Sequence, residues 1–168
     1  VDVRAMAAMK VEPPKLFSRM SSQTKPVACK SRRYSPSDRR FIQCETNRLL
    51  EEGIIEPSIS PWRAQLLVTS DDERHTKRLV VDYSRTVNPH TELDAYPVPL
   101  LDEMIDKIST YKVFTTLDLK SAYHQIPISE EERRLTAFES CGKLYHFTRI
   151  PFGVTNGGSA FQRTIDRL

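Results

Sequence analysis

The chain has 168 residues, of which 39% are hydrophobic and 28% charged, so it can bury the core of one ordinary domain. It has no run of about eighteen apolar residues and no secretory signal pattern, which argues against a membrane protein and a secreted one. Its three cysteines are far apart and form no Cys-x-x-Cys pair, which argues against a zinc finger. We therefore expect an intracellular domain, in cytoplasm or nucleus, with no membrane partner.

The net charge of +3 is concentrated at the front of the chain. Residues 1–40 carry ten Lys or Arg against three Asp or Glu, whereas residues 41–168 carry a net charge of −4. Prolines interrupt residues 1–33, which show no sustained period. We expect a basic, loosely ordered arm over 1–33 and a folded domain over 34–168. The arm would either bind phosphates or only keep the chain soluble.

The first helix is expected over residues 35–52. Ser35 can cap it, Pro36 fits its first turn, and Gly53 can adopt the left-handed conformation that ends it. Helical spacing predicts an inward face made of Phe41, Ile42, Glu45, Leu49 and Leu50.

The next segments predict a hairpin with strands at 64–69 and 78–83. Both are short and apolar, and residues 70–77 between them are polar throughout, so they predict a mobile, charged tip. Asp82, late in the second strand, is expected to bond the loop that follows it. Farther along, apolar residues at helical spacing predict a helix over 100–108, and residues 112–119 predict a strand.

The last third predicts a short helix from Ser129, a second hairpin with strands at 136–140 and 143–149, and a final helix that includes Ala160 and Leu168. The whole order is an α+β pattern with mostly antiparallel strands. Because the chain stops within an amphipathic helix, we expect it to be a fragment of a longer protein.

One carboxylate interrupts the predicted strand over 112–119. Alternation places Phe114, Thr116 and Asp118 on one face, with Asp118 last, at the end of the strand. A carboxylate there can reach solvent or a metal ion without the cost of full burial. Alternatively, Asp118 only caps the turn that follows.

The segment Leu-Asp-Leu-Lys-Ser-Ala-Tyr-His-Gln-Ile-Pro-Ile at 117–128 resembles the first catalytic motif of reverse transcriptases from gypsy-like long-terminal-repeat retrotransposons. Three other blocks occur in that family's order, and the resemblance covers roughly residues 30–168. It implies a partial right-hand polymerase fold, with the fingers and the first part of the palm built from antiparallel hairpins and packed helices. It also implies an RNA-directed DNA polymerase within a retrotransposon polyprotein. The three other blocks lie at 51–63, 77–83 and 150–162.

The resemblance further implies a magnesium site. Asp118 and the backbone carbonyl of Leu119 would bind two magnesium ions that act on the primer and the departing pyrophosphate. The family's second catalytic motif, Tyr-x-Asp-Asp, does not occur in this sequence. We therefore expect an incomplete metal site and a fragment that is inactive by itself.

For the incoming nucleotide, the resemblance implies that Arg78, with Lys77 as a second candidate, contacts the triphosphate. Tyr123 would lie beneath the sugar and select deoxynucleotides by shape. Phe152, where retroviral enzymes have glutamine, and Gly153 would line the same site. The alternative for each of these residues is that it only serves the structure of a hairpin edge or a turn and contacts no nucleotide.

Template and primer contacts are expected at Trp62, Asn156 and Gln162. The pair Gly157-Gly158 departs from the family's pattern and predicts a looser start to the last helix. The expected partners are an RNA/DNA template-primer, deoxynucleoside triphosphates and the rest of the polyprotein. The alternative function is a non-catalytic retroelement remnant that binds nucleic acid or protein.

Overall fold

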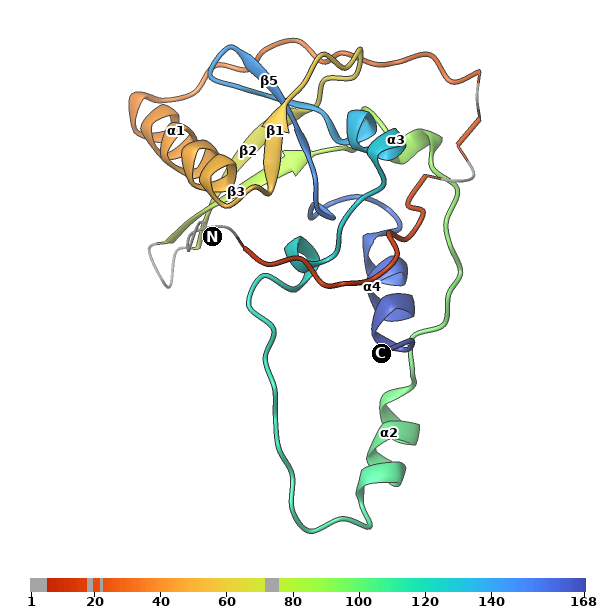
Figure 1. Cartoon of the computed structure of the whole chain (residues 1–168). Coiled ribbons are helices and arrows are strands. Elements are labelled where there is room, and N and C mark those ends of the chain that lie inside the picture. The colour runs from red at the N-terminus through yellow and green to blue at the C-terminus, as the bar shows by residue number, and fades with distance from the viewer. Residues whose placement is uncertain (1–5, 18–19, 22, 72–75) are drawn as a thin grey trace.

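The computed structural model describes residues 6–17, 20–21, 23–71 and 76–168, so the central part of the predicted hairpin tip lies outside the described residues. Figure 1 shows the chain, and none of its described helices is long and apolar enough to cross a membrane. The helices are α1 (Pro36–Glu51), α2 (Leu101–Ile108), α3 (Glu130–Arg133) and α4 (Gly157–Ile165). The strands are β1 (Ile55–Pro57), β2 (Gln65–Asp71), β3 (Thr76–Asp82), β4 (Phe138–Ser140) and β5 (Lys143–Phe147).

Helix α1 begins and ends as its sequence predicts. The Ser35 hydroxyl accepts the Asp38 backbone N–H at 3.1 Å, and Gly53 has a φ of +69°. Ile42 and Leu49 are buried as predicted. Thr46 is also buried, which hydrophobicity alone did not predict, because its hydroxyl lies 2.7 Å from that of Ser140 on β4.

The strands form two small antiparallel sheets. Strands β2 and β3 pair as the predicted first hairpin, and β4 and β5 pair as the second, with β1 added to give the order β1-β5-β4. A bridge between Ala64 and Phe138 connects the end of the first sheet to the second. Both sheets and α1 thus share one core, which contains Ile54, Leu66 and Phe138.

Part of the predicted loose arm is instead anchored in this core. Leu16 and Phe17 are 1% and 4% exposed. Their backbone N–H groups donate to the Glu132 carboxylate at 3.0 and 2.8 Å. Two isolated apolar residues give no periodic signal, so the sequence pattern does not reveal that they are packed.

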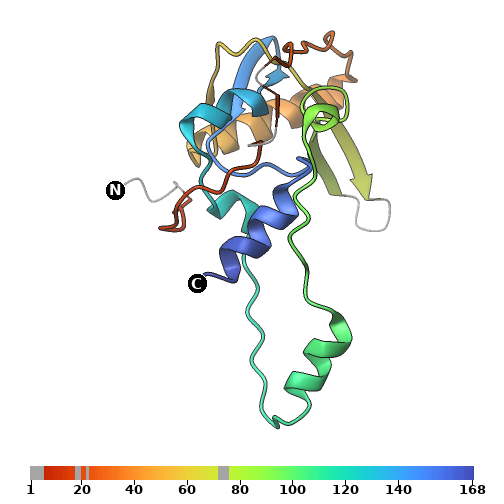
Figure 2. The same cartoon turned by 90° about the vertical axis from the view of Figure 1, so that its right-hand side faces the viewer.

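The two sheets, α1 and the segments packed on their core are called the body below. Residues 97–120 differ from the body, because every one of them is exposed. Figures 1 and 2 show α2 and the segment after it projecting from the rest of the chain. The prediction of a helix here is confirmed, but α2 has no buried residue. The prediction of a strand over 112–119 is wrong for this structure, because a strand requires a hydrogen-bonded neighbour and no described segment pairs with it.

Candidate nucleotide-binding site

A cavity of about 540 Å³ lies between α1, the β2–β3 hairpin, the second sheet and the turn at 121–124. Lys77 and Arg78 on β3 line it, and Phe152 lines it from the segment before α4. Ser121 and His124, on either side of Tyr123, complete the wall. Three of the residues predicted to contact a nucleotide therefore line one cavity, although they come from two distant parts of the chain.

The two cations on β3 differ in their contacts. Lys77 Nζ binds Asp38 Oδ1 at 2.7 Å and Ser37 Oγ at 2.9 Å, at the first turn of α1. The hydrogen bond from Lys77 holds the pKa of Asp38 below its ordinary value. Arg78 is exposed and has no ion pair within the part of the chain that the structure describes. Of these two cations, Arg78 is thus the one whose charge is left without an ion pair among the described residues.

Aromatic rings of His124, Phe147 and Phe152 form one wall of the cavity, and Tyr123, which does not line it, packs behind this wall against Phe152. The ring centroids of Tyr123 and Phe152 are 4.9 Å apart, and those of Phe152 and His124 are 5.3 Å apart. His124 also stacks on Phe147 at 6.0 Å, and Tyr123 is supported by Phe161 at 5.3 Å. Because Phe152 is 50% exposed, this wall presents a ring to the surface.

His124 is a member of the site that the sequence did not single out. Burial first, and then the charge of Arg48, lower the pKa of His124 from 6.5 to about 4. Its ring is therefore neutral at neutral pH and acts as part of the apolar wall. The one sequence feature that could have identified His124 as part of the site is its position directly after Tyr123.

Gly153 is required by its backbone. It has a φ of +91°, and a Cβ at this position would lie 3.2 Å from the Val81 carbonyl oxygen on β3. The Asn88 amide fixes the same loop by donating to the Gly153 carbonyl at 2.8 Å and accepting the Thr155 N–H at 3.1 Å. The backbone at Gly153 therefore approaches β3 closely. This contact positions the neighbouring Phe152, which lines the cavity.

The start of α4 lies close to Tyr123. A Cβ at Gly157 would be 3.2 Å from Val154 Cγ2 and 3.8 Å from Tyr123 Cε1, and one at Gly158 would be 3.8 Å from the Tyr123 hydroxyl. Only the distance to Val154 is tighter than an ordinary contact, and Gly157 is buried, so close packing favours glycine at 157. The distances to Tyr123 are those of an ordinary contact, so Gly158 is not required by packing.

The residues predicted to contact template and primer lie elsewhere. Trp62 is 3% exposed and packs in the core, so its ring is not presented to a nucleic acid. Gln162 donates to Asp166 Oδ1 at 2.9 Å along α4 and does not line the cavity of Arg78. Burial of Trp62 does not support direct contact with a nucleic acid, whereas the contact expected of Gln162 stays a prediction.

Asn156 is 7% exposed, and its side-chain amide holds three segments together. It accepts the Asp94 N–H at 2.9 Å and donates to the carbonyls of Leu16 at 3.0 Å and Glu92 at 2.9 Å. All its contacts are with the protein's own backbone. Its observed position is that of an internal clamp, which corrects the expectation of a template contact.

Asp118 and Leu119 are both exposed, and neither lines the cavity of Arg78. Among the described residues, no group of three His, Cys, Asp or Glu side chains is placed to hold a metal ion. Asp82, by contrast, is structural as predicted, since it accepts the Ser84 hydroxyl and backbone N–H. The residues that would bind nucleotide are thus brought together, whereas the predicted metal ligands are not joined to them.

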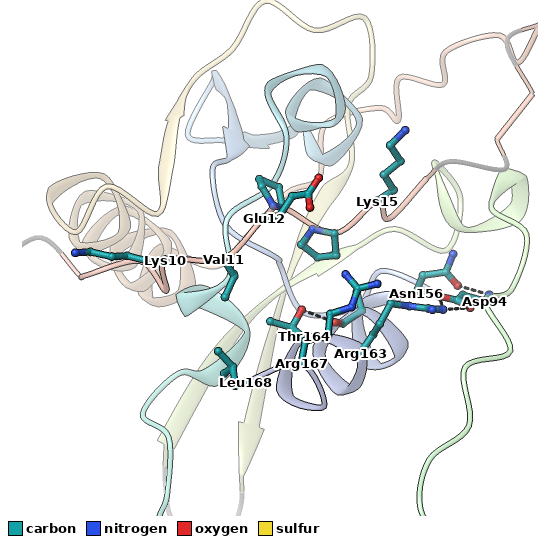
Figure 3. Close-up of a pocket in the computed structure, with 13 residues that line it drawn as sticks. Lys10, Val11, Glu12, Lys15, Asp94, Asn156, Arg163, Thr164, Arg167 and Leu168 are labelled. Carbon is teal, nitrogen blue, oxygen red and sulfur yellow. Dashed lines mark hydrogen bonds and ion pairs between the residues drawn. The ribbon is translucent and has the colours of Figure 1, made fainter.

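A second cavity, of about 720 Å³, separates residues 10–15 from α4 (Figure 3). Arg163 on its α4 wall is bound by both Asp94 oxygens, at 2.9 and 2.8 Å, and lies 4.2 Å from the Tyr96 ring centroid. Figure 3 shows the Lys10 and Lys15 side chains directed away from α4. The two lysines therefore do not converge with Arg163, whose charge is already paired with Asp94.

Comparison with known proteins identifies the family. Residues 54–168 match the family model described as reverse transcriptase (RNA-dependent DNA polymerase). The retrovirus-related Pol polyprotein from transposon gypsy of Drosophila melanogaster is 42% identical over 133 residues, which are 75% of this chain and 13% of the polyprotein. The enzymatic polyprotein of cauliflower mosaic virus (strain Strasbourg) is 34% identical over 151 residues, or 88% of this chain and 22% of that protein. The chain thus spans less than a quarter of each relative.

Solved structures share the fold. A crystal structure of the prototype foamy virus protease-reverse transcriptase matches 98% of this chain and 22% of its own, with a TM-score of 0.81 and 27% identity. A foamy viral protease-reverse transcriptase in complex with RNA/DNA hybrid matches with a TM-score of 0.77 at 20% identity, which shows the fold alone. These matches confirm the predicted partial polymerase fold. The chain belongs to the reverse transcriptase (RNA-dependent DNA polymerase) family, and its relatives include Pol polyproteins of the gypsy-like retrotransposon group.

Proposed function

We propose that this chain supplies the fingers and the first part of the palm of an RNA-directed DNA polymerase within a retrotransposon polyprotein. This proposal rests mainly on the cavity, which is lined by Arg78, Phe152 and the turn that contains Tyr123. In a chain of the reverse transcriptase family, this cavity is the proposed site of the incoming deoxynucleoside triphosphate.

The chemistry of the wall suits such a ligand. The guanidinium of Arg78 can form two charge-assisted hydrogen bonds with phosphate oxygens. The exposed face of Phe152 and the ring of Tyr123 offer flat apolar surface to a sugar or base. We propose that Tyr123, wedged between Phe152 and Phe161, selects deoxynucleotides because it cannot move away from a 2′-hydroxyl.

This chain supplies only part of the ligand set that a divalent metal site needs. Enzymes of the family generally use a divalent metal ion. Asp118 is the one carboxylate predicted as a ligand, and a single carboxylate does not fit a site for two magnesium ions. We therefore derive no catalytic step through the metal, and propose Asp118 as one ligand whose partners lie outside the described residues.

The proposed partners are a template-primer duplex and the rest of the polyprotein. A related foamy viral enzyme is described in complex with RNA/DNA hybrid, which supports a nucleic-acid partner here. Residues 97–120 expose Leu101, Ile105 and Phe114. Apolar surface of this kind marks an interface, and we propose that other parts of the polyprotein cover it.

The test is primer extension on an RNA template by the complete polymerase that contains this segment. We expect Asp118→Asn to abolish extension, and Arg78→Ala to raise the KM for deoxynucleotide about tenfold, as expected for the loss of a charge-assisted phosphate contact. Asp106→Asn, which also removes an exposed carboxylate from the projecting region, is the matched control and should extend normally.

Full extension by Asp118→Asn would contradict the ligand role of Asp118. An unchanged KM in Arg78→Ala would contradict the nucleotide site. If the unmodified polymerase binds nucleic acid but never extends a primer, the non-catalytic alternative is the correct function.

A further inference from the structure

The outer half of the β2–β3 hairpin has little packing against the core. This packing ends at the paired residues Val68 and Leu79, which are half-buried. Beyond that pair, residues 69–70 and 76–78 are all exposed. Arg78 belongs to this outer half and lines the cavity. Because a two-stranded hairpin is only marginally stable by itself, the position of Arg78 depends on what holds the outer half of the hairpin.

Lys77 joins this outer half to α1. Its Nζ donates to Asp38 Oδ1 at 2.7 Å and to Ser37 Oγ at 2.9 Å. Within the described part of the chain, no other side-chain hydrogen bond or ion pair connects residues 69–70 or 76–78 to the rest of the molecule. The contact therefore fixes the backbone of β3 at the residue directly before Arg78.

Asp38 is itself held in place and can serve as a fixed anchor. The Ser35 hydroxyl donates to Asp38 Oδ2 at 2.8 Å, and the Asp38 backbone N–H donates to Ser35 Oγ at 3.1 Å. The inner face of α1 is buried in the shared core. A continuous chain of contacts thus runs from the core through α1, Asp38 and Lys77 to the strand that carries Arg78.

The dipole of α1 does not account for the contact between Asp38 and Lys77. It favours a carboxylate in the first turn of a helix, and Asp38 meets this preference whether or not Lys77 is present. The two residues are 39 positions apart in the chain, so their contact arises from the packing of the hairpin on α1. A partly exposed ion pair contributes little to global stability. Its effect is therefore expected in the position of the hairpin.

We propose that Asp38 is a positioning residue for the nucleotide site, because its ion pair with Lys77 holds Arg78 at the cavity. The effect on nucleotide binding rests on the proposed function, whereas the fixing of the hairpin does not. Lys77 then acts on structure and not on the triphosphate. If Asp38 only withheld Lys77 from a phosphate, removing its carboxylate would free a cation and tighten nucleotide binding. The two roles of Asp38 therefore predict opposite effects of one substitution.

The test is primer extension by the complete polymerase that contains this segment, with KM and kcat for deoxynucleotide measured separately. We expect Asp38→Ala and Lys77→Met each to raise KM about two- to fivefold and to leave kcat unchanged, as expected for the loss of one partly exposed ion pair. The double variant should raise KM no more than either single variant, because both remove the same contact. Lys77→Arg keeps the charge and should keep the KM of the unmodified enzyme.

A second measurement uses this chain by itself. Hydrogen exchange of the backbone amides of residues 76–79 should become about two- to fivefold faster in Asp38→Ala. The control, Glu56→Gln, removes a carboxylate from another partly exposed ion pair, with Arg133 at 3.1 Å, which does not line the cavity. It should change neither KM nor this exchange. Thermal unfolding shows whether each variant keeps its fold, and Lys77→Met replaces Asp38→Ala if that variant does not.

An unchanged or lower KM in Asp38→Ala would overturn the proposal, as would additive effects of Asp38→Ala and Lys77→Met. Unchanged exchange at residues 76–79 would also overturn it, whatever the outcome of primer extension. If Arg78→Ala raises KM and Asp38→Ala does not, the positioning role alone is wrong. If Arg78→Ala leaves KM unchanged, the proposed nucleotide site is wrong, and hydrogen exchange still decides whether Asp38 holds the hairpin.

Discussion

The packed body and the projecting residues 97–120 have similar apolar patterns but different surroundings. Phe138 on β4 is 1% exposed, whereas Phe114 in the projecting segment is 62% exposed. Helix α2 has a clear apolar stripe, and yet Leu101, Met104 and Ile105 on that stripe are all exposed. An apolar pattern in the sequence therefore stabilises the fold only where a second helix or strand covers the apolar side chains.

The residues of the proposed site are distributed over both regions. The nucleotide cavity is built within the body, from α1, the sheets and the 121–124 turn. Asp118 belongs to the projecting segment, where no described residue contacts it through a hydrogen bond or ion pair. The residues proposed to contact the nucleotide and the residue proposed to bind the metal thus lie in different parts of the molecule.

The largest expected effect is on the stability of the body. Phe138→Ala should lower the free energy of unfolding by about 4 kcal/mol, because it leaves a cavity in the shared core. The matched variant Phe114→Ala should lower it by less than about 0.5 kcal/mol, as expected for an exposed side chain. Urea denaturation of both variants measures the difference. Similar losses would mean that the projecting segment is packed in solution and that the contrast is false.

A smaller effect is expected from the titration of His124. Its pKa is about 4 in the folded protein and about 6.5 when unfolded, so the unfolded state binds a proton first as pH falls. The corresponding stability is present above pH 6.5 and is lost as pH falls toward 4, in all about 3 kcal/mol. His124→Gln should remove this part of the pH dependence.

Unfolding free energies of the unmodified chain and His124→Gln, measured from pH 7 to pH 4, provide the check, since other titrating groups cancel in the difference. The control is His90→Gln, which changes an exposed histidine of the same body. Parallel curves for His124→Gln and the unmodified chain would show that the imidazole is not buried against Phe147 and Phe152.

The smallest of the three effects is expected at the internal clamp. Asn156→Ala should lower the free energy of unfolding by about 2 kcal/mol, because it leaves buried backbone groups of Leu16, Glu92 and Asp94 without their partners. Asn47→Ala, on the exposed face of α1, should change it by less than about 0.5 kcal/mol. An equal, small change in both would show that Asn156 does not join these segments in solution.

Local signals predicted most of the body. The Ser35 cap and Gly53 define α1, a polar tip defines the first hairpin, and the turn at Cys141-Gly142 defines the second. The same signals failed where the outcome depends on distant partners. Residues 112–119 have a strand pattern without a neighbouring strand, and Leu16 is buried by residues far along the chain.

The candidate site was predicted through motif resemblance more than through physical pattern. Resemblance selected Arg78 and Phe152, which the structure places in one cavity. It also selected Trp62 and Asn156, whose burial is invisible in a motif. His124 was missed because a histidine after a turn is unremarkable until its stacking on two phenylalanines is known.

The anchoring of Leu16 and Phe17 has a consequence for synthesis on the ribosome. Their backbone partners, Glu132 and Asn156, lie 115 to 140 residues later in the chain. At about 5–20 residues per second, synthesis of the intervening chain takes about 6 to 28 seconds. Leu16 and Phe17 cannot form these hydrogen bonds during that interval, so the N-terminal segment can dock only after residue 156 has been made.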